Sequence, residues 1–229
     1  MHPPSCVLLK LSGEAFKGPQ GPLSPESLRH IVEEIASLND TRLAIVVGGG
    51  NIIRGARNQW LGRVEADALG MLATIINGLA LKSFLEEFGR EVIVQSAIVS
   101  EFAEPVAPDK ACAAMRDGKI VVFVGGTGNP FVTTDTAAAV RAAAIRADVV
   151  AKASNVDGVF TSDPAKGGAT QLLRELSFDA FIEKRYGVMD LVAVEICREN
   201  NLPIVVFNWN KPGALRAIAS GEKIGTLIC

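Results

Sequence analysis

The sequence predicts an α/β domain with an open, mainly parallel sheet sandwiched by helices, a three-layer αβα arrangement. Short apolar runs alternate with longer helix-like stretches along the 229 residues, which is the pattern of strands joined by crossover helices. One run, residues 6–11, is apolar on both faces apart from a single lysine, as expected for a central strand. Several runs end in glycine-rich or polar turns, at the edge where open α/β sheets bind ligands.

The first elements are delimited by their end signals. The strand that contains residues 6–11 leads into a loop opened by Ser12 and Gly13. Ser24-Pro25-Glu26 marks a helix start, with the serine as N-cap and the proline at the first helical position, and this helix is predicted to run to about residue 39. A strand at 43–47 follows, and then a long helix over about 66–88 that ends at Gly89.

Further strands are predicted near residues 92–97, 120–124, 149–153 and 203–208, with helical stretches between them. An alanine-rich helix is expected over 136–145. The dipeptide Asp157-Gly158 predicts a tight hairpin turn after the strand at 149–153. Because no linker or internal repeat is present, we expect one domain over residues 1–229.

Composition argues for a cytoplasmic protein. The net charge of −2 gives no general attraction to nucleic acid or to a membrane surface. No apolar stretch approaches the roughly 20 residues that span a bilayer, and the N-terminus lacks the features of a secretory signal. Cysteines at positions 6, 112, 197 and 229 are scattered, which predicts free thiols in a reducing compartment and no zinc site.

The most informative segment is the turn at residues 125–135, which follows the strand at 120–124 and leads into the alanine-rich helix. Such a turn gathers backbone N–H groups at a helix N-terminus, where an anion is favoured. Thr133 and Thr134 add hydroxyl groups, and Asp135 adds a carboxylate that can organise a cation. The same composition also occurs in plain turns between a strand and a helix.

Three other strand ends favour the phosphate interpretation. Lys10 lies near the end of an apolar strand, where an unpaired ammonium group would be costly. Gly48-Gly49-Gly50 follows the strand at 43–47, and the guanidinium of Arg54 is suited to phosphate. A third polar loop follows the strand at 149–153. Neither the G-x-x-x-x-G-K-[ST] motif nor the G-x-G-x-x-G motif is present, which excludes a P-loop or Rossmann assignment.

In these segments the chain resembles the bacterial-type uridylate (UMP) kinases of the amino acid kinase superfamily. The resemblance covers nearly the whole chain, and its motifs are long and in fixed order: 8–15 (LLKLSGEA), 47–55 (VGGGNIIRG), 70–80 (GMLATIINGLA), 126–138, 148–164, 188–191 (VMDL), 206–216 and 225–227. It implies the amino acid kinase fold and Mg²⁺-dependent, direct in-line transfer of the γ-phosphoryl group from ATP to UMP, as in pyrimidine nucleotide biosynthesis.

The resemblance also implies a set of site residues. It gives catalytic roles to Lys10, Arg54 and Asp135. The implied ATP-binding residues are Lys10, Leu11, Ser12, Gly13, Gly50, Arg54, Ser154, Asn155, Phe160 and Asp163. The implied UMP-binding residues are Gly49, Asp67, Thr127, Gly128, Asn129, Pro130, Phe131, Val132, Thr133 and Thr134. The acceptor part would span about residues 1–145 and the ATP-binding part about 146–229.

Several of these residues also have ordinary structural interpretations. Arg54 can be a loop arginine, Phe160 a core aromatic residue, and Asp67 and Asp135 carboxylates that complement a helix dipole. The family places the residue that matches Asp67 on the acceptor nucleotide, at its ribose hydroxyls. Asp190, in the motif VMDL, is a further active-site candidate, whereas Lys152 is interpreted only as a cleft-lining residue or a structural partner.

The family implies ATP and UMP as substrates, Mg²⁺ carried with ATP rather than held by a protein metal site, and a homohexamer. It also implies activation by GTP and inhibition by UTP. Two alternatives stay open. One is a carboxylate or carbamate kinase of the same superfamily, against which the segment 127–135 and Asp67 argue. The other is a non-catalytic nucleotide- or oxyanion-binding protein, against which the presence of Lys10, Arg54 and Asp135 together argues.

Overall fold

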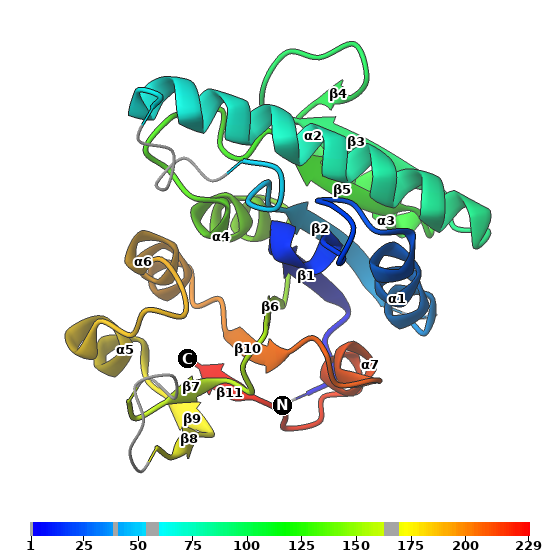
Figure 1. Cartoon of the computed structure of the whole chain (residues 1–229). Helices are drawn as coiled ribbons and strands as arrows, with labels where there is room; N and C mark the ends of the chain where they lie inside the picture. The colour runs from blue at the N-terminus through cyan, green and yellow to red at the C-terminus, as the bar shows by residue number, and fades with distance from the viewer. Residues whose placement is uncertain (1, 39–40, 54–59, 163–169) are drawn as a thin grey trace.

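The computed structural model describes residues 2–38, 41–53, 60–162 and 170–229. In this part of the chain nine strands form one sheet, shown in Figure 1. Their spatial order is β4 (Glu104–Pro105), β3 (Val92–Ser96), β5 (Ile120–Val124), β2 (Arg42–Val47), β1 (Cys6–Leu11), β6 (Val149–Ser154), β10 (Ile204–Asn208), β11 (Thr226–Ile228) and β9 (Glu175–Leu176). All neighbouring pairs are parallel except β10 and β11. The predicted fold class is confirmed.

Helices cover both faces of the sheet, each over its own hydrophobic core (Figure 1). The first layer contains α1 (Pro25–Ala36), α2 (Arg63–Glu87) and α7 (Ala214–Ala219). The second layer contains α3 (Pro108–Arg116), α4 (Thr134–Ala144), α5 (Phe178–Lys184) and α6 (Leu191–Glu199). Alternation along β1 divides its side chains: Leu9 and Leu11 pack in the first core, and Leu8 in the second.

The strand order places a topological switch point at the centre of the sheet. From β1 the chain passes to β2, then outward to β3 and β4 and back to β5, which lies between β3 and β2. It then crosses to the other side of β1 with β6. Loops after β1 and β6 therefore leave the sheet in opposite directions, and a crevice opens at the carboxyl ends of these two strands. Lys10 of β1 and Lys152 of β6 lie directly opposite each other at this point.

The structure corrects several predicted boundaries. Helix α1 ends at Ala36, before the predicted end near residue 39. Helix α4 begins at Thr134 because Thr133 caps it, accepting hydrogen bonds from the backbone N–H groups of Asp135 and Thr136. Helix α2 begins at Arg63 rather than near residue 66.

The predicted hairpin at Asp157-Gly158 is wrong. Strand β6 pairs with β1 and β10, and the next strand, β7 (Val159–Phe160), pairs instead with β8 (Leu172–Leu173). The Asp157 carboxylate is bound by Asn208, the last residue of β10, and by Lys211, which follows that strand. Tertiary contacts, rather than local turn chemistry, therefore determine the path of this segment.

Helix α2 is the one helix in the described residues whose length and composition would allow it to cross a membrane. It packs along β3 and β5, as Figure 1 shows, and it buries Leu81 and Leu85 in the first core. Its outer side exposes Leu69, Leu72 and Ile76. We assign α2 to the core of the domain, with an apolar outer stripe.

Candidate active site

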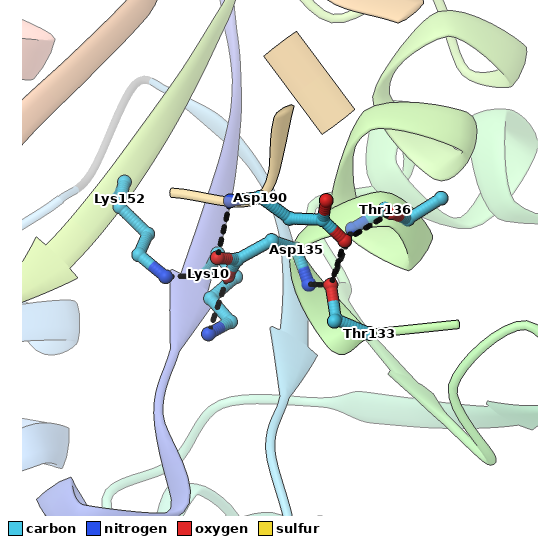
Figure 2. Close-up of polar contacts among 6 residues, drawn as sticks. All are labelled: Lys10, Thr133, Asp135, Thr136, Lys152 and Asp190. Carbon is cyan, nitrogen blue, oxygen red and sulfur yellow. Dashed lines mark hydrogen bonds and ion pairs between the residues drawn. The ribbon is translucent and has the colours of Figure 1, made fainter. Parts of the chain in front are cut away.

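Two lysines and one aspartate form the centre of the site (Figure 2). Lys10 Nζ lies 2.6 Å from Asp135 Oδ1, and the ammonium group of Lys152 contacts the same oxygen. The parallel register sets Lys10 opposite Lys152 and turns both side chains toward α4, whose second residue is Asp135. All three side chains are buried. Two cationic groups therefore meet on a single carboxylate at the switch point of the sheet.

This arrangement shifts the pKa values of its members. Burial alone would raise the pKa of Asp135, but the charges of Lys10 and Lys152 outweigh it and hold that pKa well below its usual range. Burial, together with the positive charge of Lys10, lowers the pKa of Lys152 to about 7. The carboxylate thus stays ionised, and the excess positive charge makes the centre receptive to an anion.

Asp190 connects this centre to the turn before α4. Its Oδ2 accepts hydrogen bonds from the hydroxyl groups of Thr133, at 2.8 Å, and Thr136, at 3.0 Å. Its backbone N–H donates to Asp135 Oδ2 at 3.4 Å, and its Oδ1 caps α6. Figure 2 shows the four residues in contact around the start of α4. Asp190 therefore fixes the orientation of the residues that surround the two lysines.

One cavity, of about 390 Å³, opens beside Lys10 between the start of α2, the glycine turn after β2 and the turn before α4. Seven of the residues implied for UMP line this cavity: Gly49, Asp67, Thr127, Asn129, Val132, Thr133 and Thr134. Four of those implied for ATP also line it: Lys10, Ser12, Gly13 and Gly50. Gly128, Pro130 and Phe131 lie outside this lining. Leu11, which is also implied for ATP, does not line the cavity, because its side chain packs in the first core.

Asp67 connects two segments that line this cavity, the start of α2 and the turn before α4. Its Oδ2 accepts hydrogen bonds from the backbone N–H of Phe131 and from Arg63 Nε, both at 2.8 Å. Phe131 has a φ of 67°, a left-handed conformation that costs a non-glycine residue energy. The Arg63 guanidinium lies 5.7 Å from the centroid of the Phe131 ring. Helix α2 and the segment after β5 are thus joined across the cavity.

Two buried side chains of α2, Thr74 and Asn77, hold the glycine turns in place. Asn77 Nδ2 donates to the carbonyl oxygen of Gly48 at 2.6 Å, and the Asn77 and Asn51 amides also bind each other. Thr74 Oγ1 accepts a hydrogen bond from the backbone N–H of Gly125 at 2.6 Å. A β-carbon on Gly49 would lie 2.6 Å from the Gly70 carbonyl oxygen, so only glycine allows α2 to approach this closely.

A second cavity, of about 590 Å³, lies beyond the end of β6, between residues 154–162 and residues 184–188. Two of the residues implied for ATP line it: Ser154, at the end of β6, and the half-buried Phe160. Asn155 lies between lining residues without lining the cavity itself. Arg54 and Asp163, also assigned to ATP from the sequence, lie outside the described residues.

Sequence reasoning missed the parts played by Thr74 and Asn77. It named Asp190 only as a candidate, and Lys152 only as a cleft-lining residue or a structural partner. For Lys152 a signal existed, because it is a lone lysine inside an apolar strand, as Lys10 is. The roles of Thr74 and Asn77 depend on the packing of α2, which has no trace in the local sequence. Among the described residues no cluster of three or more His, Cys, Asp or Glu side chains is placed to hold a metal ion.

Comparison with known proteins agrees with this architecture. The model of the amino acid kinase family matches residues 5–208. A uridylate kinase of Magnetococcus marinus is 49% identical over 228 residues, which are 97% of this chain and 95% of the relative. The crystal structure of UMP kinase from Bacillus anthracis matches with a TM-score of 0.95 at 41% identity, covering 99% of this chain and 96% of the other. UMP kinase from Ureaplasma parvum matches with a TM-score of 0.91 at 33% identity, over 98% of each chain.

Proposed function

The chain belongs to the amino acid kinase family, among its uridylate kinases, and we propose that it transfers the γ-phosphoryl group of ATP to UMP, giving UDP and ADP. The observation that carries this proposal is the buried pair of Lys10 and Lys152 on one Asp135 carboxylate, with one cavity lined by Lys10 and a second lined by Ser154, two residues after Lys152. Two anionic substrates have to meet for this reaction, and a preorganised pair of ammonium groups counteracts their repulsion.

We assign the cavity beside Asp67 to UMP and the cavity beside Phe160 to ATP. The first cavity lies in the part before about residue 145 and the second in the part after about residue 146. Asp67 offers a carboxylate to the ribose hydroxyl groups, and the turn at 127–134 offers backbone N–H and threonine hydroxyl groups to the uracil and the acceptor phosphate. Catalytic roles are assigned to Lys10, Lys152, Asp135 and Arg54.

The geometry favours direct in-line transfer. The acceptor is a phosphate oxygen that is already ionised at neutral pH, because the second pKa of a phosphate monoester is about 6. No general base is required, so the protein contributes mainly alignment and neutralisation of charge. As the γ-phosphoryl group leaves ADP and bonds to the UMP oxygen, Lys10 and Lys152 can exchange part of their contact with Asp135 for phosphoryl oxygens.

A magnesium ion fits this site as part of the nucleotide. Asp135 is already bound by two ammonium groups, and the described residues offer no carboxylate cage. Mg²⁺ commonly keeps substrate phosphates as its ligands, so we expect the phosphate oxygens of ATP to hold it. When bound, the ion withdraws charge from those phosphates.

The proposals for assembly and regulation are based on family membership. We propose a cytoplasmic homohexamer, activated by GTP and inhibited by UTP. The exposed apolar stripe of α2 supports self-association, because contiguous apolar patches on soluble proteins often mark interfaces.

The test is release of ADP by the purified protein with ATP, Mg²⁺ and a panel of UMP, CMP, dUMP, N-acetylglutamate, aspartate and carbamate. Turnover mainly with UMP is expected. Turnover with a carboxylate or with carbamate would reassign the protein to another kinase of the family. Absence of turnover, together with tight nucleotide or oxyanion binding, would contradict the proposal in favour of a binding protein. Lys10→Ala should abolish turnover with a much smaller loss of UMP binding, because the other residues that line the UMP cavity remain.

A further inference from the structure

Three buried side-chain nitrogen atoms in the described residues have no hydrogen-bond partner within the protein: Gln95 Nε2, Arg141 Nε and Trp209 Nε1. The first two lie in the same part of the molecule. Gln95 on β3 is the register partner of Phe123 on β5, and the Arg141 guanidinium lies 5.9 Å from the centroid of the Phe123 ring. Because buried polar groups are normally paired, two unpaired donors on residues that both neighbour Phe123 need an explanation.

A hollow of about 560 Å³ lies beside these donors, between α4 and the segment 96–108. Arg141 lines it directly. Gln95 is tied to its wall, because its Oε1 accepts the backbone N–H of Ala107 at 3.0 Å, and Ala107 stands between two lining residues, Val106 and Pro108. The hollow is distinct from the lysine pair and from both substrate cavities.

The charge in the hollow is uncompensated. Of the described lining residues, Arg141 is the one that is charged at neutral pH; the others are apolar or carry hydroxyl groups. No hydrogen bond or ion pair of Arg141 is found within the described part of the chain, and burial lowers the pKa of its guanidinium. A half-buried arginine normally has a carboxylate or another acceptor beside it.

We propose that Arg141 forms a binding site for a small oxyanion, a phosphate or carboxylate group, in the hollow between α4 and the segment 96–108, whose wall Gln95 supports through Ala107. The guanidinium presents a planar fork that binds such groups through two parallel hydrogen bonds. Thr127 lines both this hollow and the cavity assigned to UMP, so the bound anion would lie against the acceptor segment.

The test is a binding titration, which needs no catalysis. Inorganic phosphate is added to wild type and to Arg141→Gln at constant ionic strength, and the melting temperature is followed. Wild type should gain stability that Arg141→Gln does not, with an apparent dissociation constant at least roughly 10-fold tighter, as for one charge-assisted hydrogen bond. Arg116→Gln, at an exposed arginine on α3, is the matched control and should behave as wild type.

Phosphate can also enter the UMP cavity, so only the difference between the variants is informative. Equal gains in wild type and Arg141→Gln, or no gain in wild type, would overturn the proposal. If Arg141→Gln does not fold, Arg141→Lys keeps the charge but loses the fork, and weaker phosphate binding than in wild type is again required. Repeating the titration with acetate distinguishes a carboxylate site from a phosphate site. An increase in melting temperature with acetate alone identifies a carboxylate site, and an increase with phosphate alone identifies a phosphate site.

Discussion

The carboxylate of Asp67 accepts the backbone N–H of Phe131, which lies 64 residues further along the chain, at 2.8 Å. This hydrogen bond joins the first turns of α2 to the segment that precedes α4, and Arg63 supports it from the same helix. Both bonds use Oδ2 of Asp67. The carboxylate is therefore held in a defined orientation at the mouth of the cavity assigned to UMP.

Replacing Asp67 with Asn should raise the KM for UMP. The amide cannot give the ribose hydroxyl groups a charged acceptor, and a charge-assisted hydrogen bond is worth enough for a roughly 10- to 150-fold increase. Steady-state kinetics with UMP and dUMP measure this, and Lys82→Gln, on the exposed side of α2, is the control. If wild type uses UMP and dUMP with equal efficiency, the ribose role of Asp67 is wrong.

Replacing Lys152 with Met should lower kcat by about 100-fold or more, as removal of one donor to a developing charge typically does. The KM for UMP should change little, because Lys152 does not line the UMP cavity. Lys152→Arg keeps the charge and should retain more activity than Lys152→Met. Lys119→Gln is a control at a lysine far from the site. Wild-type kcat in Lys152→Met would exclude Lys152 from the reaction.

Lys152 should also make the stability of the ligand-free protein depend on pH. Its pKa is about 7 in the folded protein, against an ordinary value of 10.5. Between these values the unfolded chain binds a proton that the folded protein does not. This lysine therefore makes the free energy of unfolding increase as the pH rises through this range, by at most about 1.4 kcal/mol per pH unit. Urea unfolding at several pH values should show this gain in wild type and not in Lys152→Met; a gain of the opposite sign in wild type relative to the variant would refute it.

Replacing Thr74 with Val should destabilise the protein by about 1–3 kcal/mol, because the buried N–H of Gly125 would lose its only described partner without access to water. Thr74→Ser keeps the hydroxyl group and should stay closer to wild type. Denaturant unfolding gives both values. A loss as large in Thr74→Ser as in Thr74→Val would attribute the effect to packing instead of the hydrogen bond.

The apolar stripe of α2 allows a test of assembly. Leu72 and Ile76 are each about half exposed, at 49% and 47%. Introducing Glu at both positions places charges where a second subunit would pack, so light scattering should show smaller particles than for wild type. Lys184→Glu, on α5, is the control. An unchanged mass in the double variant would place the interface elsewhere.

The sequence predicted the sheet, the main helices and the strand ends that meet at the cleft, because periodic burial and glycine turns are local signals. It could not predict that Asn77 binds the Gly48 carbonyl or that Asp67 binds Phe131, since those contacts depend on how α2 docks. The hairpin at Asp157-Gly158 failed for the same reason: Asn208 and Lys211, distant in sequence, hold the aspartate. The sequence pattern that singles out Lys10, a lone lysine in an apolar strand, also applies to Lys152. Its partner carboxylate on α4 could be identified only from the structure.

The pairing of β1 with β6 has a consequence for folding fidelity. Lys10 faces Lys152 because of the register in which the two strands pair, from Val7 opposite Val149 to Lys10 opposite Lys152. A slip of β6 by a single residue would bring Ala151 or Ala153 opposite Lys10 and turn Lys152 toward the α1, α2 and α7 layer, against apolar side chains. Such a chain could keep most of its secondary structure and yet lack one of its two cations. Catalytic activity in this protein is thus a direct reporter of correct strand alignment at the centre of the sheet.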